Sequence, residues 1–131
     1  MEKKENSGPL SGIRVLDLSR ILAGPSSAQL LGDLGADVIK IERPGSGDDT
    51  RGWGPPWLKD EQGNETPESA YFLCANRNKR SLTIDFTKQE GYEVLKKLAS
   101  KADVLIENFK VGGLEQYGLN YESIHELFPD L

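Results

Sequence analysis

The residues best suited to ligand chemistry lie in a turn that follows an apolar, β-rich run at residues 13–18. Gly24 is small enough to cap a helix N-terminus and Pro25 fits the first helical position, so the next backbone N–H groups would face outward. A helix N-terminus also carries a partial positive charge, which favours an anion such as phosphate. A turn that only reverses the chain fits the same residues equally well. The turn alone therefore leaves a phosphate site and a structural role open.

Other charged residues follow at positions where they could complete such a site. Glu42 ends a second apolar run roughly twenty residues later, where dinucleotide-binding folds keep a ribose-binding acid, although the turn lacks the GxGxxG spacing. Asp48 and Asp49 could bind a cation, but adjacent loop acids are usually solvated and no calcium-loop spacing follows them. Five basic residues could contact a phosphate, namely Arg43, Arg51, Arg77, Lys79 and Arg80. The alternative is that these charges only form a solvated face.

Nucleophilic and metal-dependent chemistry are not indicated by the remaining candidates. His125 is the single histidine, and no serine or cysteine stands at a recognisable motif spacing from it, so we expect a surface histidine. Cys74 is the single cysteine, which leaves no disulfide framework and no thiolate metal site, and we expect its side chain to be buried. Trp53 and Trp57 could form an aromatic lid or cover an edge of the core. We therefore expect no metal site.

These candidates must be positioned by alternating strands and helices. Two parallel strands joined by a helix are predicted near the N-terminus. The strands are the apolar run at residues 13–18 and the β-rich run at residues 38–41, and the helix is the amphipathic segment between them, which Gly35 closes. A second unit begins with a strand at residues 81–86 and ends with one at residues 103–107. The alternation predicts an α/β fold, with a mostly parallel sheet and helices packed on its faces.

The second unit also carries helix signals. Thr87 and Glu90 form a capping box, and Asn120 caps a further helix at residues 121–127. The apolar face of the first of these helices comprises Val94, Leu95, Leu98 and Ala102. Between the two units, residues 44–69 are rich in Gly and Pro and show no period, which predicts a long functional or mobile loop.

Composition favours one compact unit. A chain of 131 residues, 37% hydrophobic and 28% charged, is enough for one core with about two-thirds of its surface buried. The net charge of −5 argues against a nucleic-acid partner, which needs a dominant basic face. No stretch approaches the roughly 18 apolar residues of a membrane span, and residues 1–12 form a polar extension unlike a signal or transit peptide. We expect a cytoplasmic protein, or a mitochondrial matrix protein if a transit peptide is missing from this chain.

Ligands of open α/β sheets bind outside the carboxyl ends of the strands. The residues that follow the predicted strands are therefore the main candidates for binding. They lie at 20–25, 42–43, 85–87 and 108–110.

Several blocks of the sequence resemble family III coenzyme A (CoA) transferases. The blocks occur in the order and with the spacing of that family, over about residues 9–131: LSRILAGPSSAQLLGDLGADVIKIERPGSGDDTRGWG, NRNKRSLTIDF, ADVLIENF and GLEQYGLNYESI. The resemblance implies a Rossmann-like large domain, a smaller second domain and two chains interlocked as rings in a homodimer. Residues 13–131 would be the N-terminal part of the CoA-binding large domain, and the chain would be a fragment.

The resemblance also implies a CoA-binding role for particular residues. All but one of these residues lie in the strand-end segments selected above on physical grounds. The exception, Ile84, lies in the third predicted strand. The implied residues are Arg20, Ile21, Leu22, Ala23, Arg43, Ile84, Asn108 and Phe109.

By the same resemblance, the reaction moves CoA from an acyl-CoA to a carboxylic acid, and the loop after residue 44 looks most like the subgroup that uses succinyl-CoA and glutarate. The family nucleophile is an aspartate beyond Leu131, which implies no catalytic residue in this chain and no activity of the chain alone. CoA and acyl-CoA are substrates, and no tightly bound cofactor is implied. The alternatives are an acyl-CoA racemase of the same family, a dinucleotide-binding oxidoreductase fragment and a non-catalytic interaction fragment.

Overall fold

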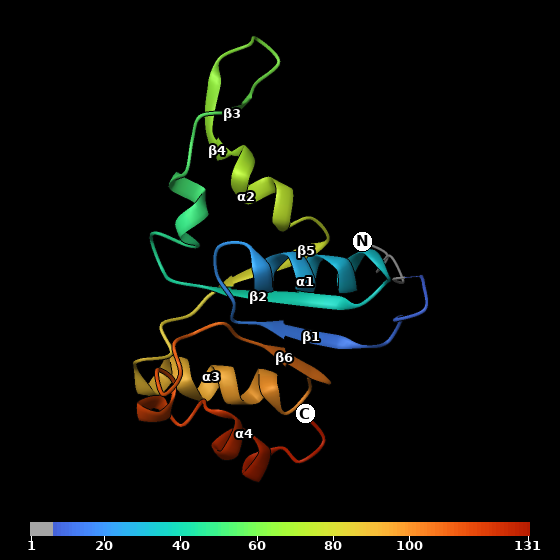
Figure 1. The fold of residues 1–131 in the computed structure, drawn as a ribbon, viewed down its shortest axis with the longest axis vertical. Helices are drawn as coiled ribbons and strands as arrows, with labels where there is room; N and C mark the ends of the chain where they lie inside the picture. The colour runs from blue at the N-terminus through green and yellow to red at the C-terminus, as the bar shows by residue number, and fades with distance from the viewer. Residues whose placement is uncertain (1–6) are drawn as a thin grey trace.

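The computed structural model describes residues 7–131 and contains a four-stranded parallel sheet (Figure 1). The strands lie side by side in the order β5 (Lys79–Thr83), β2 (Asp37–Glu42), β1 (Arg14–Asp17) and β6 (Val104–Ile106). Counted along the chain, this order is third, second, first and fourth, as in the first part of a doubly wound, Rossmann-like sheet. The predicted fold class is confirmed.

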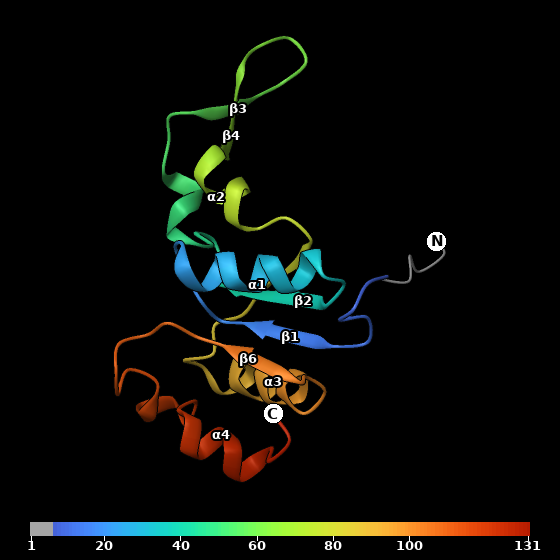
Figure 2. The ribbon, with the colours of Figure 1, turned by 45° about the vertical axis from the view of Figure 1, so that its right-hand side comes forward.

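Helices cover both faces of the sheet because successive strand residues point to opposite sides. Val15 of β1 packs with Ala28 on one face, whereas the next residue, Leu16, packs with Leu95 and Ile124 on the other. Figures 1 and 2 show helices on both sides of the sheet. These helices are α1 (Ala23–Asp33) on the first face, and α3 (Gln89–Ala99) and α4 (Tyr121–Leu127) on the second.

The helix after the first strand starts earlier than the sequence predicts. α1 begins at Ala23 with Leu22 as its N-cap, so Gly24 and Pro25 lie inside the first turn and the prediction of Gly24 as the cap is wrong. The absence of a side chain at Gly24 instead permits a close approach, since a Cβ there would lie 2.3 Å from the Cβ of Ser19. Pro25 is tolerated because residues in the first turn need no intrahelical N–H partner.

The boundaries of the second unit also differ from prediction. Strand β5 begins at Lys79, where it pairs with Val38 of β2, instead of at residue 81. The capping box is wrong, because α3 has Lys88 as its N-cap and the Thr87 hydroxyl donates to the Asp85 carboxylate at 2.6 Å. Val94, predicted on the apolar face, is 44% exposed, because α3 packs chiefly through Leu95 and Ala99.

Residues 44–69 contain regular structure, so their prediction as an aperiodic loop is wrong. A 3-10 helix, η1 (Asp49–Gly52), precedes an antiparallel hairpin of β3 (Trp57–Lys59) and β4 (Glu65–Ser69), and α2 (Ala70–Ala75) follows directly. The hairpin projects from the body of the molecule (Figure 2). Ser69 ends the hairpin and caps α2 by accepting the Tyr71 N–H at 3.1 Å. Such short, capped elements leave no apolar period in the sequence.

The predictions for the single cysteine and the single histidine have opposite outcomes. Cys74 is exposed, so its predicted burial is wrong; only Ala75 of the short helix α2 is buried. His125 is exposed on α4 and stacks on Tyr121 with 5.3 Å between ring centroids, which confirms a surface histidine.

The predicted N-terminal extension is described only in part, since residues 1–6 lie outside the described residues. Leu10 packs against the α1 side of the core, and its N–H donates to the carbonyl of Leu34 at 3.0 Å. Within residues 7–131, no helix has the length and apolar character needed to cross a membrane.

Candidate functional site

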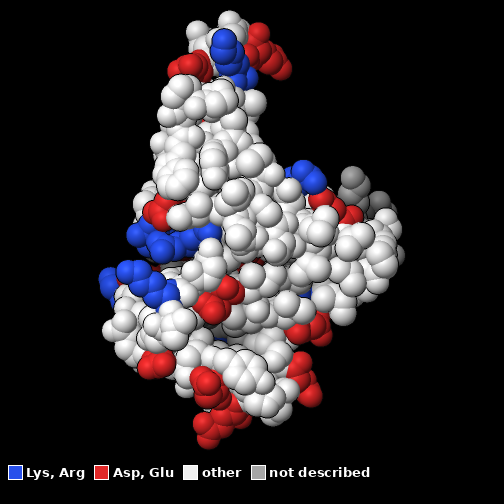
Figure 3. All heavy atoms as spheres, viewed as in Figure 1, with Lys and Arg blue, Asp and Glu red and all other residues white. Residues whose placement is uncertain are grey.

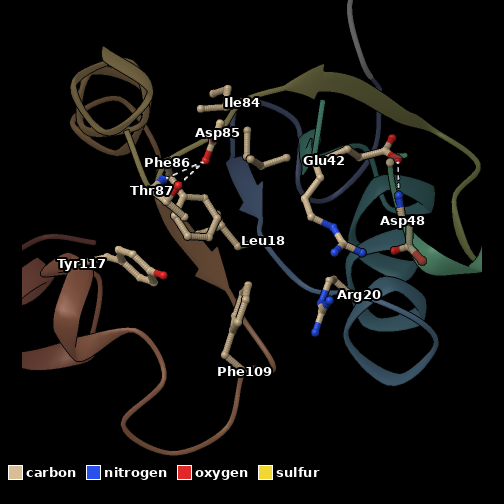
Figure 4. Close-up of a pocket in the computed structure, with 13 residues that line it drawn as sticks. Leu18, Arg20, Glu42, Asp48, Ile84, Asp85, Phe86, Thr87, Phe109 and Tyr117 are labelled. Carbon is tan, nitrogen blue, oxygen red and sulfur yellow. Dashed lines mark hydrogen bonds between the residues drawn. The ribbon is translucent and has the colours of Figure 1, made fainter. Parts of the chain in front are cut away.

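A cavity of about 260 Å³ lies at the carboxyl ends of the strands (Figure 4). Its lining includes at least one residue from beyond each strand of the sheet, among them Leu18 after β1, Arg43 after β2, Ile84 after β5 and Phe109 after β6. Parallel strands bring these segments to one edge, and open α/β sheets bind their ligands there.

The cavity has an aromatic side and a charged side (Figure 4). The ring of Phe86 meets Phe109 and Tyr117 edge to face, with centroid distances of 6.1 Å and 5.7 Å. Arg20 approaches from the opposite side and places its guanidinium 5.4 Å from the centroid of Phe109. The cavity can therefore accept a flat apolar group together with an anion.

The rim of the cavity carries two arginines that share one carboxylate. Arg20 Nη1 lies 3.3 Å from Asp49 Oδ2, and Arg43 Nη2 pairs with Asp49 Oδ1. The side chains of Arg20 and Arg43 are 40% and 55% exposed, so solvent reaches both guanidinium groups. Figure 3 shows blue side chains gathered at the left edge of the view, at the level where the strands end in Figure 1.

The loop that carries Arg20 is held by side chains from other elements. Asn108 accepts the Arg20 N–H at 2.9 Å and donates to the Arg20 carbonyl at 2.8 Å. Ile21 has a left-handed φ of 71°, and its N–H donates to both carboxylate oxygens of Asp48 at 3.3 Å. Asn108 and Asp48 thus fix the main chain on both sides of Arg20.

Buried ion pairs lie behind this loop. Lys40 Nζ lies 2.9 Å from Asp48 Oδ2 and donates to the Ser19 carbonyl at 2.9 Å. Lys79 Nζ lies 2.9 Å from Asp17 Oδ2, and the other oxygen of Asp17 accepts the Ser19 N–H at 3.0 Å. Burial lowers the pKa of Lys79, although the Asp17 carboxylate opposes the shift. Ser19, the residue before Arg20, is therefore held through both its N–H and its carbonyl.

The Glu42 carboxylate is fully engaged by the protein. It accepts two hydrogen bonds from Arg51, at 2.7 Å and 2.8 Å, one from the Ser81 hydroxyl at 2.6 Å and one from the Asp48 N–H at 2.8 Å. Burial acts to raise its pKa, but these hydrogen bonds outweigh burial and lower the pKa of Glu42 to about 2. The ribose-binding role considered for Glu42 finds no support, because its oxygens hold the loop after β2.

Four of the five predicted basic candidates form intramolecular ion pairs and do not themselves line the cavity. Arg51 binds Glu42 and stacks over Phe72, with 3.7 Å from its guanidinium carbon to the ring centroid. Arg77 pairs with a carboxylate of α1, Lys79 with one of β1 and Arg80 with one of β2, namely Asp33, Asp17 and Asp37. Arg43 is the one of the five candidates that lines this cavity.

The adjacent acids of the loop also differ from prediction. Asp48 is buried, 3% exposed, and its carboxylate accepts the Thr50 N–H at 3.0 Å and hydroxyl at 2.7 Å. Burial acts to raise its pKa, but the hydrogen bonds from Thr50 and Lys40 lower the pKa of Asp48 overall. The prediction of two solvated acids is therefore wrong for Asp48, which ties η1 to the sheet.

The tryptophans cover the base of the hairpin instead of the cavity. Trp53 meets Tyr71 edge to face at 5.3 Å, and a Cβ at Gly54 would lie 2.2 Å from the Trp57 ring. Neither tryptophan lines the cavity. The packing role is therefore favoured over an aromatic lid.

The predicted CoA-binding residues gather around this edge. Arg20, Arg43, Ile84 and Phe109 line the cavity itself. Asn108 lies behind Arg20, Leu22 is the exposed N-cap of α1, and Ile21 and Ala23 flank it in the chain.

The pairing of buried carboxylates with buried lysines, which holds the loops in place, was not predicted from the sequence. The available signal was a charged residue inside an apolar strand, as at Asp17 and Lys40, because a buried charge requires a partner. The partners, Lys79 and Asp48, lie too far along the chain or in too irregular a segment to be paired from the sequence.

The strand order and the position of the cavity define a Rossmann-like α/β protein with a cavity at the carboxyl ends of its strands. Residues 10–131 match the family described as CoA-transferase family III. The chain is 53% identical over 123 residues to a succinate–glutarate CoA-transferase of Agrobacterium fabrum, and this match covers 94% of the chain and 30% of the relative. It is 48% identical over 126 residues to the succinyl-CoA:glutarate CoA-transferase of Homo sapiens, covering 96% of the chain and 27% of the relative.

A solved structure supports the same assignment. A CAIB/BAIF family protein from Brucella suis is 55% identical and superposes with a TM-score of 0.83, over 92% of this chain and 31% of that chain. The chain therefore belongs to CoA-transferase family III, and it spans about 30% of the length of these relatives.

Proposed function

We propose that this chain is the CoA-binding N-terminal portion of an enzyme that transfers CoA from an acyl-CoA to a carboxylic acid, with a dicarboxylate as acceptor. The observation that carries the proposal is the meeting of Arg20, Arg43 and an aromatic side at one strand-end cavity. Family membership supports the reaction class, and relatives named for succinyl-CoA and glutarate support the dicarboxylate.

In this proposal the nucleotide part of CoA binds at the cavity. The guanidinium groups of Arg20 and Arg43 pair with phosphate oxygens, for which their planar fork of donors is well suited. Phe109 offers an aromatic surface to the adenine, and Ile84 supplies the apolar floor.

The remaining proposed contacts come from the loop before α1. Ile21, Leu22 and Ala23 border the ligand where the helix begins, and the partial positive charge of that end favours phosphate. Asn108 keeps the loop in place through its two hydrogen bonds to Arg20.

The proposal extends to the whole protein. Residues 13–131 form the first part of a CoA-binding domain, residues 1–12 precede it, and the nucleophilic aspartate lies outside this chain. CoA thioesters act as substrates and not as tightly bound cofactors. Two copies form a homodimer without nucleic-acid or membrane partners, in the cytoplasm or the mitochondrial matrix.

Calorimetric titration tests the binding part of the proposal. The natural-length protein should bind CoA saturably and should not bind NAD, because Glu42 has no free oxygen for a ribose. Binding of NAD without binding of CoA would overturn the proposal in favour of an oxidoreductase.

A transfer assay tests the reaction. The natural-length protein should exchange CoA between succinyl-CoA and glutarate, and the 131-residue chain alone should not exceed a heat-killed control. Epimerisation of a 2-methylacyl-CoA without any exchange would favour the racemase alternative.

A further inference from the structure

The two arginines at the cavity rim converge on a single carboxylate of the protein. Asp49 directs Oδ1 to Arg43 and Oδ2 to Arg20. Because each oxygen serves a different guanidinium, Asp49 lies between the two cations. A phosphate that bridges the same arginines would compete with Asp49 for that position.

The main chain at Asp49 is fixed independently of this contact. The preceding residue, Asp48, is buried, pairs with Lys40 and accepts two hydrogen bonds from Thr50. Its N–H also donates to Glu42. The Asp49 side chain can therefore leave the arginines without disturbing the loop that carries it.

The contacts of Asp49 are of a kind that exchanges readily. Its side chain is 33% exposed, and those of Arg20 and Arg43 are 40% and 55% exposed. Ion pairs at such exposure contribute little to stability, because water and salt screen the charges. A phosphate monoester offers more charge than a carboxylate and three acceptor oxygens, so it competes well for two guanidinium groups.

We propose that Asp49 is a resident counter-ion that holds the phosphate position between Arg20 and Arg43 and exchanges with a phosphate when CoA binds. The inference rests on the proposed CoA-binding function. It gives Asp49 a role in specificity, because a dicarboxylate acceptor carries the same functional group as Asp49. Such an acceptor gains nothing by displacing Asp49, so the nucleotide site stays selective for phosphate.

The test is calorimetric titration of the natural-length protein and of Asp49→Asn with CoA. Removing the competing carboxylate should tighten CoA binding by about two- to tenfold, the range expected when one or two exposed ion pairs no longer have to be broken. Glutarate should compete with CoA at this site in Asp49→Asn and not in the wild type. Adenosine, which lacks phosphate, should bind both proteins equally.

Two further variants serve as controls. Glu61→Gln removes one negative charge from the exposed hairpin turn and should leave CoA affinity unchanged. Asp49→Glu keeps the competing carboxylate and should therefore bind CoA less tightly than Asp49→Asn.

The outcomes separate this inference from the proposed function. If the wild type binds CoA and Asp49→Asn binds it equally or more weakly, the counter-ion role is overturned, because Asp49 then only orients the arginines or plays no part. If neither protein binds CoA, the proposed function itself fails.

Discussion

Two sets of ion pairs around the same loop differ mainly in burial. Behind the loop, the pairs Lys40–Asp48 and Lys79–Asp17 have side chains no more than 2% exposed. At the cavity rim, Arg20, Arg43 and Asp49 form pairs whose side chains are 33–55% exposed. The buried charges cannot be separated without leaving one of them unpaired away from water, whereas the rim charges can exchange with solvent or ligand. Burial thus separates the ion pairs that hold the loop in place from the exposed ion pairs at the cavity rim, which a ligand can reach.

The largest expected effect comes from the buried set. Asp48→Ala leaves Lys40 unpaired and removes the acceptor of the Ile21 N–H, so it should cost about 3–5 kcal/mol of unfolding free energy in urea denaturation. Lys88→Ala, which breaks an exposed pair with Asp85, is the matched control and should leave the free energy of unfolding close to that of the wild type. Similar values for the two variants would remove the distinction between buried and exposed pairs.

Glu42→Gln should have an intermediate effect that depends on pH. The pKa of Glu42 is lowered from 4.5 to about 2 on folding, so its carboxylate stabilises the protein above pH 4.5 and this contribution is lost as the pH falls toward 2. At pH 7 the variant should lose about 2–3 kcal/mol of unfolding free energy. The difference from wild type should shrink between pH 4.5 and 2, as measured by urea denaturation at several pH values. A difference that stays constant through this pH window would show that folding does not lower the pKa of Glu42.

The smallest effect is expected for an exposed pair outside the cavity. Arg77→Ala removes the contact with Asp33, in which the arginine side chain is 61% exposed. It should lower the unfolding free energy much less than the two variants above, and about 1 M salt should abolish the difference from wild type. A large loss of unfolding free energy that does not depend on salt would show that this pair stabilises the protein as the buried pairs do.

The parallel sheet and the position of the cavity were predictable from the sequence because their signals are local. The apolar runs around Val15 and Val38 have strand period and composition, and the strand-end rule then selects Arg43 and Phe109. Helix caps were less predictable, since Thr87 bonds to Asp85 and Gly24 serves a close approach instead of a cap.

The supporting network was not predictable because it depends on pairing between distant segments. Lys79 meets Asp17 only after β5, β2 and β1 have assembled. Asp48 lies in a Gly-rich loop where an acid is ordinarily solvated, and its burial follows from its contacts with Lys40 and Thr50. A lysine within an apolar strand indicates that a partner exists but does not identify it.

The central claim is that the rim arginines bind the nucleotide of CoA, and calorimetric titration of Arg43→Ala tests it most directly. Arg80→Ala is the matched control, since Arg80 also pairs with an aspartate and is exposed but lies near the amino ends of the strands. Loss of a charge-assisted contact should weaken CoA binding by about 1.5–3 kcal/mol, roughly ten- to a hundredfold, in Arg43→Ala and leave Arg80→Ala like the wild type. Unchanged CoA affinity in a folded Arg43→Ala protein would contradict the account and leave Arg43 as a surface partner of Asp49 alone.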